Sequence, residues 1–299
     1  MRYRPFDASG AAVSSITLSL GFDALSRGRE ATLALLYAAL EAGINSYALE
    51  TADPVAAEVL GEALSHVDRK LVCVSLTLGV GDGRQAVRDF SAEGMTGAID
   101  RVLHFSGLGW IDVAILSEPG EHELPQASLN ALKAMRATER VRLLGVSGDG
   151  EVMDAYVSTG AFDVLSTPFN IHSGWPLRNR IRTAREQDMA VFAYDYFRDR
   201  RQRRDDAPAP KRGLFGFGAP RPAAAPSKID PYDFLYRTPN WSAEAICLTY
   251  ALTDPSIASV IVKATDVERL KDLAETPERD MPPGLGAQIE MARVSRTAA

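Results

Sequence analysis

The sequence lacks the features that define several classes of protein. Only two of its 299 residues are cysteines, Cys73 and Cys247, and each lies in an apolar stretch, so we expect buried, reduced thiols and no disulfide. No apolar run approaches the roughly 18 residues of a spanning helix, and no signal-peptide core follows the charged start. The net charge of −6 does not favour nucleic acid as a partner. These absences predict a cytoplasmic protein with no metal site and no membrane span.

A Gly-x-Gly-x-x-Gly turn is also absent after the first predicted strand, so a doubly wound dinucleotide-binding sheet is only the alternative fold. Apolar runs of strand length alternate with segments of helical period along the chain. The predicted strands are 16–20, 45–49, 71–76, 111–116, 141–146, 164–167, 190–194 and 259–262. Each is apolar and followed by a helix, the last one with Asp266 as its predicted N-cap. The sequence therefore predicts one α/β domain over 1–299, a closed (β/α)8 TIM barrel.

One segment, 198–228, interrupts this alternation after the seventh predicted strand. It has five prolines and three glycines, and its nine Lys and Arg against three Asp give it a charge of +6. Such a segment is too long and too rich in proline for an ordinary connection, so we expect a flexible basic insertion. It could be only solvated, or it could dock an acidic partner or cover the barrel mouth. The last residues, 292–299, are predicted to be a flexible tail.

Several short stretches, in the same order and at the same spacing, resemble the aldo-keto reductases. They are 1–4 with 9–14, 42–45 with 58–64, 111–113, 141–147, 168–170 and 193–194. The resemblance covers nearly the whole chain apart from 198–228. It implies a TIM barrel of aldo-keto reductase type whose floor is closed by an N-terminal β-hairpin, and a nicotinamide cofactor.

Members of that family reduce carbonyls with NAD(P)H and an Asp, Tyr, Lys and His tetrad, in which the tyrosine donates the proton. Aligned without gaps, the aspartate position falls on Ala48 and the tyrosine position on Asp53. A shift of two residues moves them to Glu50 and Val55. Neither register supplies a tyrosine.

The other two tetrad positions are degenerate as well. The lysine position falls on Leu76 and the histidine position on Ser117. Leucine cannot lower the pKa of a neighbouring acid, and general acid catalysis is worth roughly 10²–10⁴ in rate. The resemblance therefore implies a pseudoenzyme without a catalytic residue. A misaligned tetrad is one alternative. Another is an active NAD(P)H-dependent oxidoreductase with Glu118, Asp53 or Glu50 as its acid or base.

The positions that hold the nicotinamide in the family are partly kept. Tyr194 occupies the position of the aromatic ring that stacks on the nicotinamide, with Phe197 close by in the sequence. Ser147 matches the serine that holds the carboxamide. Gly148 and Ser166 stand where the family has an asparagine and a glutamine, which reduces the carboxamide contacts. The resemblance thus implies a nicotinamide site with fewer polar contacts.

The adenosine end is implied by residues after the last strand. Lys263 and Arg269 match the basic pair near the adenosine 2′-phosphate, and Asp272 matches an acid that contacts adenine. The two cations could also be ordinary surface charges. A basic pair suits NADP(H), but Arg269 could stack on adenine, so the predicted cofactor is NAD(H) with NADP(H) left open.

A tetrad-free barrel with a basic insertion resembles the degenerate aldo-keto reductases that regulate bacterial cell division. That resemblance implies binding of NAD(H), inhibition of the division GTPase FtsZ and modulation of a DivJ-like histidine kinase. The terminal Ala298 and Ala299 resemble tails that the ClpXP protease reads, although they could be a frayed end without function. A scaffold that binds no nucleotide is a third hypothesis.

Overall fold

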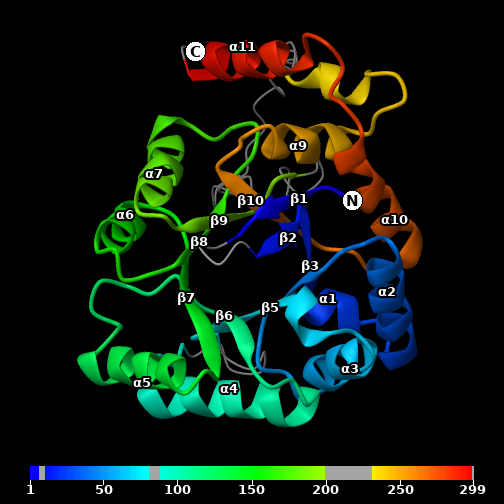
Figure 1. The fold of residues 1–299 in the computed structure, drawn as a ribbon. Coiled ribbons are helices and arrows are strands. Elements are labelled where there is room, and N and C mark those ends of the chain that lie inside the picture. Colours follow the sequence, from blue (N-terminus) through cyan, green and yellow to red (C-terminus); the bar gives the residue numbers. More distant parts are fainter. Residues whose placement is uncertain (7–10, 81–87, 199–230, 298–299) are drawn as a thin grey trace, which may run out of the picture.

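A computed structural model describes residues 1–6, 11–80, 88–198 and 231–297, and these form a closed barrel of eight parallel strands. In barrel order the strands are β10 (Ile257–Val262), β3 (Ile16–Leu20), β4 (Ser46–Leu49), β5 (Cys73–Leu78), β6 (Ile111–Ser117), β7 (Val141–Ser147), β8 (Val164–Pro168) and β9 (Ala190–Tyr194). Figure 1 shows the ring of strands inside a layer of helices. The predicted barrel is confirmed, and the doubly wound alternative is wrong, because β10 pairs with β3 and closes the sheet.

The outer layer follows the strands in sequence order. It consists of α1 (Phe22–Leu25), α2 (Arg29–Glu41), α3 (Pro54–Leu64), α4 (Ala92–Ser106), α5 (Gln126–Ala137), α6 (Glu151–Ser158), α7 (Trp175–Glu186), α9 (Ala243–Leu252), α10 (Val267–Glu275) and α11 (Leu285–Thr297). Short 3₁₀ helices lie at η1 (Arg69–Leu71), η2 (Asp233–Tyr236) and η3 (Thr276–Glu278). Helix α10 begins where the sequence predicts, because Asp266 accepts a hydrogen bond from the backbone N–H of Arg269 at 2.9 Å.

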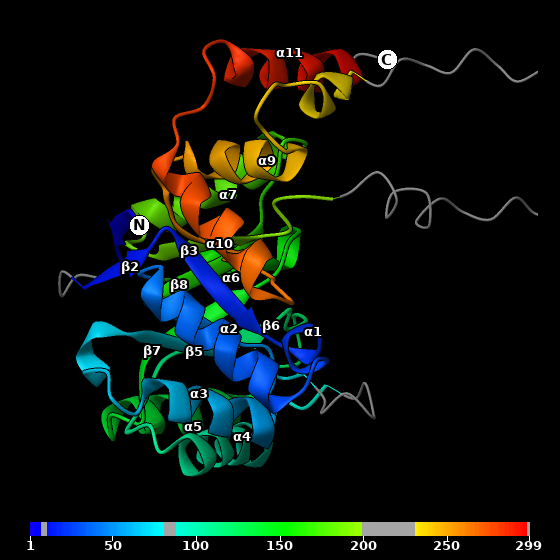
Figure 2. The same ribbon diagram turned by 90° about the vertical axis from the view of Figure 1, so that its right-hand side faces the viewer.

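The predicted N-terminal hairpin closes the floor of the barrel. It consists of β1 (Tyr3–Pro5) and β2 (Ala12–Ser14), and in Figure 2 it lies on the side of the barrel opposite α1. Phe6, just after β1, stacks on Phe192 inside the barrel with ring centroids 5.5 Å apart. Arg4 donates hydrogen bonds to three carbonyls around the end of α9, which joins the hairpin to the helical layer.

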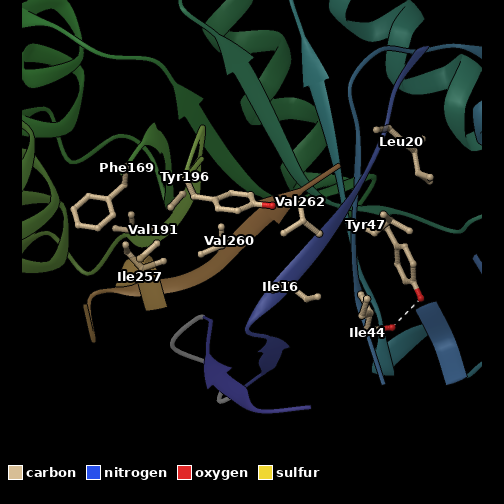
Figure 3. Packing of buried hydrophobic residues seen from close by; sticks show 14 of the residues in the cluster. Ile16, Leu20, Ile44, Tyr47, Phe169, Val191, Tyr196, Ile257, Val260 and Val262 are labelled. Carbon is tan, nitrogen blue, oxygen red and sulfur yellow. Dashed lines mark hydrogen bonds between the residues drawn. The ribbon is translucent and has the colours of Figure 1, made fainter. Parts of the chain in front are cut away.

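Alternation along each strand divides the core in two. The smaller cluster lies inside the barrel and includes Cys73 and Phe192, while the larger one lies between strands and helices and includes Leu76. Figure 3 shows part of the larger cluster, with the buried Tyr47 donating a hydrogen bond to the carbonyl of Ile44 at 2.8 Å. Both cysteines are buried, as predicted, Cys73 inside the barrel and Cys247 on α9. The face on which a strand residue lies therefore decides whether it can reach a site.

The structure describes most of the predicted C-terminal tail but little of the predicted basic insertion. The basic insertion follows β9, and apart from Arg198 it lies outside the described residues. The predicted tail 292–299 is helical as far as Thr297, because α11 continues into it and buries Leu285, Ile289 and Ala292 along one stripe. Helix α11 lies beside α9 in both views (Figures 1 and 2). Among the described helices none has the length and apolar character needed to cross a membrane.

Candidate functional site

A cavity of about 1070 Å³ lies at the carboxyl ends of the barrel strands. Each strand contributes one inward-facing residue to it: Ser19, Ala48, Thr77, Ser117, Ser147, Ser166, Tyr194 and Ile261. The loops beyond the strands add further polar and charged side chains. This is the end of a TIM barrel at which active sites are found.

The residues predicted to hold the nicotinamide are brought together in this cavity. Ser147, Ser166, Tyr194 and Phe197 all line it. Burial raises the pKa of Tyr194 to about 12, against the opposing effect of a hydrogen bond with Ser147, while the carboxylate of Glu118 raises it further. Tyr194 is therefore a neutral phenol at physiological pH, and its ring is held at the end of β9.

Lys263, one of the two predicted cations, also lines the cavity, where it contacts an acid. Its Nζ lies 2.7 Å from Oε1 of Glu50, and the same oxygen accepts a hydrogen bond from the hydroxyl of Ser19 at 2.7 Å. Burial lowers the pKa of Lys263, but the hydrogen bond and charge of Glu50 outweigh burial and raise the pKa above its ordinary value. Lys263 therefore stays charged in the cavity.

Arg269, the second cation, is also paired. Its guanidinium lies 2.8 Å from Oε1 of Glu244, and this oxygen also accepts a hydrogen bond from the Tyr196 hydroxyl at 2.8 Å. All three residues line the cavity. Asp272 lies one turn further along α10, where it is exposed and outside the cavity lining. The sequence did not single out Glu244 and Tyr196, because an acid in the first turn of a helix is ordinarily explained by the helix dipole.

The structure corrects the residue at the predicted lysine position. Leu76 is fully buried in the cluster between strands and helices, and Thr77 is the residue of β5 that lines the cavity. Successive side chains of a strand point to opposite faces, so a shift of one residue exchanges core for cavity. Ser117 at the end of β6 lines the cavity, where the resemblance predicts it. The cavity is thus flanked by Thr77 and Ser117 at the ends of β5 and β6.

The residues at the end of β4 distinguish the two alignments that were considered for the aspartate and tyrosine positions. Ala48 and Glu50 both line the cavity, because they lie two residues apart on the same face. Asp53 instead caps α3, where its Oδ1 accepts a hydrogen bond from the backbone N–H of Ala56 at 2.9 Å, and it lies outside the cavity lining. Val55 is on α3 and 46% exposed. The carboxylate that faces the cavity is therefore Glu50.

Two cavity residues have an unusual backbone. Glu118, after β6, and Asp195, after β9, have φ values of 46° and 50°, in the left-handed region that non-glycine residues rarely adopt. Arg88 holds Glu118 in place, donating to its carbonyl at 2.7 Å and lying 3.3 Å from its Oε2. Backbone strain of this kind persists only where surrounding contacts enforce it, and it clusters at functional sites.

The structure is a TIM barrel with a hairpin closing its floor and a cavity at the carboxyl-terminal ends of its strands. The chain belongs to the aldo/keto reductase family, whose model matches residues 17–283. Its structure is similar to that of aldo-keto reductase AKR11C1 from Bacillus halodurans in the holo form, with a TM-score of 0.75 and 18% identity over 98% of this chain and 96% of that one.

Two further comparisons agree on the fold. The apo form of the same Bacillus halodurans enzyme gives a TM-score of 0.70 at 17% identity, over 98% of this chain and 96% of that one. A protein from Pseudomonas aeruginosa that is named as an aldo-keto reductase gives a TM-score of 0.66 at 16% identity, over 96% of this chain and 95% of that one. A search of curated proteins found no match. At these identities the likeness to solved structures concerns the fold alone.

Proposed function

We propose that this protein binds NAD(H), with NADP(H) left open, and acts as a regulator without reducing a carbonyl. The observation that carries the proposal is the composition of the strand-end cavity. Tyr194 and Ser147 line it as the resemblance predicts, Ser166 lines it in place of a glutamine, and Lys263 and Arg269 line it as well. At the ends of β5 and β6 the lining residues are Thr77 and Ser117, neither of which is a lysine or a histidine. Ligand pockets have volumes of about 300–1000 Å³, so the cavity has the size that a dinucleotide needs.

The acid–base properties of the cavity support the absence of turnover. A bound NAD(P)H would supply a hydride, and the protein would have to supply the proton. Both phenols among the described cavity residues, Tyr194 and Tyr196, have pKa values raised by burial and by neighbouring carboxylates. A tyrosine that donates a proton needs a lowered pKa, and Thr77 cannot provide the charge that would lower it.

Tyr194→Ala is expected to weaken NADH binding about 10-fold, because stacking of an aromatic ring on a base is worth about 1–3 kcal/mol. Tyr194→Phe keeps the ring and loses only the hydroxyl, so its affinity should stay within about threefold of the wild type. Isothermal titration with NADH and NADPH measures both. Failure of the wild type to bind either dinucleotide would contradict the proposal and favour a scaffold.

The alternative of an active oxidoreductase is favoured by one observation, which is that Glu50 and Glu118 are among the carboxylates lining the cavity. Either could serve as an acid or base next to the ring of a nicotinamide. Substrate-dependent oxidation of NADH or NADPH that is lost in Glu118→Gln or Glu50→Gln would establish this alternative over the regulatory one.

For partners we propose the bacterial division machinery, on the strength of the resemblance to KidO, an oxidoreductase-like regulator of division and cell fate. The partners would be FtsZ and a DivJ-like histidine kinase. The basic segment 198–228 carries +6 in a chain whose total charge is −6, so it suits an acidic protein surface. Recognition by ClpXP through Ala298 and Ala299 stays a prediction, since both lie outside the described residues.

Changing Arg200, Arg201, Arg203 and Arg204 together to Gln is expected to reduce inhibition of FtsZ assembly at least about fivefold at low salt. The change keeps the chain length and removes four positive charges that would attract an acidic surface. Sedimentation of FtsZ polymers at increasing protein concentrations measures the inhibition. NADH affinity should be unchanged, which controls for damage to the barrel. Unaltered inhibition would show that the insertion has no docking role.

A further inference from the structure

Arg180 is a buried cation that the proposed site does not yet explain. It lies on α7, and its side chain is only 2% exposed. Its Nε donates to Oδ1 of Asp154 at 2.6 Å, its Nη2 donates to the carbonyl of Gly150 at 2.9 Å, and its Nη1 donates to Oδ1 of Asp149. One guanidinium thus joins α7 to the start of α6 and to the turn before it.

That turn, 148–150, directly follows Ser147 at the end of β7. Strand β8 also contacts the turn, since the N–H of Gly148 donates to the carbonyl of Ser166 at 3.0 Å and the hydroxyl of Thr167 donates to the carbonyl of Gly148 at 3.0 Å. From α6, the N–H groups of Met153 and Asp154 donate to the carbonyl of Gly150 at 3.1 and 3.2 Å. Gly148 and Gly150 have φ values of 144° and 85°, which glycine adopts readily because it has no Cβ. For the same reason, neither residue has a side chain that could hold the turn in place. Arg180 adds a restraint from α7 that reaches both Asp149 and Gly150.

The turn is coupled to the ring at the nicotinamide end of the cavity. Ser147 and Tyr194 both line the cavity, and beside burial the charge of Asp149 contributes to raising the pKa of Tyr194. A charge has to lie near a phenol to act on it, so Asp149 belongs to the surroundings of the ring. Movement of Asp149 and Gly150 would be passed along the chain to Ser147.

A structural role alone does not require this arrangement. Burying a cation has a large desolvation cost, and a buried ion pair is often no more stable than apolar residues of the same volume. Two of the three acceptors of Arg180 lie in the turn next to the cavity, and not along the contact between α6 and α7. What the guanidinium adds beyond packing is a fixed position for that turn, since its planar fork holds three acceptors at set directions.

We propose that Arg180 is a positioning residue for dinucleotide binding: it holds the 148–150 turn, and through it Ser147, where the nicotinamide carboxamide would be bound. The inference rests on the proposed function. Lys263 and Arg269 are held instead by Glu50 and Glu244, which are not part of this turn. The loss of Arg180 should therefore affect the nicotinamide end alone.

The test compares NADH with ADP-ribose, which keeps the adenosine diphosphate and lacks the nicotinamide. Arg180→Met is expected to lower the affinity for NADH about 10-fold. In metal sites, the loss of a residue that orients a ligating side chain lowers the metal affinity about 10- to 100-fold, and Arg180 would have a comparable orienting role here. The affinity for ADP-ribose should stay within about twofold. Arg182→Met is the matched control on the same helix, because Arg182 is 65% exposed, and it should change neither affinity.

Equal losses for NADH and ADP-ribose, or no loss for NADH, would overturn the positioning role. If Arg180→Met does not fold, Asp149→Asn is the second variant, because Arg180 keeps Asp154 and the Gly150 carbonyl there. It should lower NADH affinity about threefold with ADP-ribose unchanged, and an unchanged NADH affinity would overturn the role. A wild type that binds neither ligand would overturn the proposed function itself, which distinguishes the two failures.

Discussion

Leu76→Lys is expected to destabilise the protein by more than about 5 kcal/mol, which is enough to unfold it or prevent its expression. Leu76 is fully buried among apolar side chains between β5 and the helices. The substitution removes a core side chain, and it also places an ammonium group where described neighbours are apolar. Such a lysine would have to lose its proton or force the core open.

Thr77→Lys, one residue further, is the matched control and should cost no more than about 1 kcal/mol. The side chain of Thr77 faces the cavity, so a lysine there can reach solvent and the acids that line it. Urea unfolding of both variants, followed by circular dichroism, measures the difference in free energy of unfolding. Similar losses in the two variants would mean that the assignment of faces along β5 is wrong.

Asp112→Ala is expected to cost about 3–5 kcal/mol, the second largest effect, because it removes the carboxylate partner of Arg69, whose side chain is only 16% exposed. Asp112 is 6% exposed at the start of β6. Its carboxylate accepts hydrogen bonds from Arg69 at 2.6 Å, from the Trp110 indole at 2.8 Å and from the N–H of Val74 at 2.8 Å. Removing it takes an acceptor from the buried N–H of Val74 and from two partly buried side-chain donors beneath the barrel.

The control for this variant is an acid of the same kind at the surface. Asp100 is 54% exposed on α4 and pairs with Arg140, so Asp100→Ala should cost at most about 1 kcal/mol. Thermal and urea unfolding of both variants provide the comparison. A cost below about 1.5 kcal/mol for Asp112→Ala would show that its three hydrogen bonds are replaced by water.

The architecture could be predicted from the sequence because its periodicities are local. Runs such as 111–116 and 141–146 are long enough and apolar enough to predict buried strands, and they are found as β6 and β7. Asp266 has the side chain of an N-cap ahead of an amphipathic helix, and it caps α10. The end of the chain was harder to predict, because the apolar stripe of α11 is short and the polar residues around it are typical of a tail.

The site was predictable at strand ends and less so between strands. Ser147 and Tyr194 end their strands, and their placement in the cavity follows from the barrel alone. Around Leu76 the apolar Val74, Leu76 and Leu78 alternate with Ser75 and Thr77, but the alignment to the family placed the lysine position one residue away from the cavity face. The pairing of Arg269 with Glu244 joins residues 25 positions apart on different helices, which no periodicity encodes.

The ring of one cavity residue per strand also bears on how such a barrel changes its role. Four of the eight ring residues are serines, and the apolar packing that keeps the fold together lies behind them, on the opposite face of each strand. Chemistry and stability are therefore encoded by different residues of the same strands. A lineage can exchange members of the ring one at a time, losing or gaining an activity, while the fold is retained throughout.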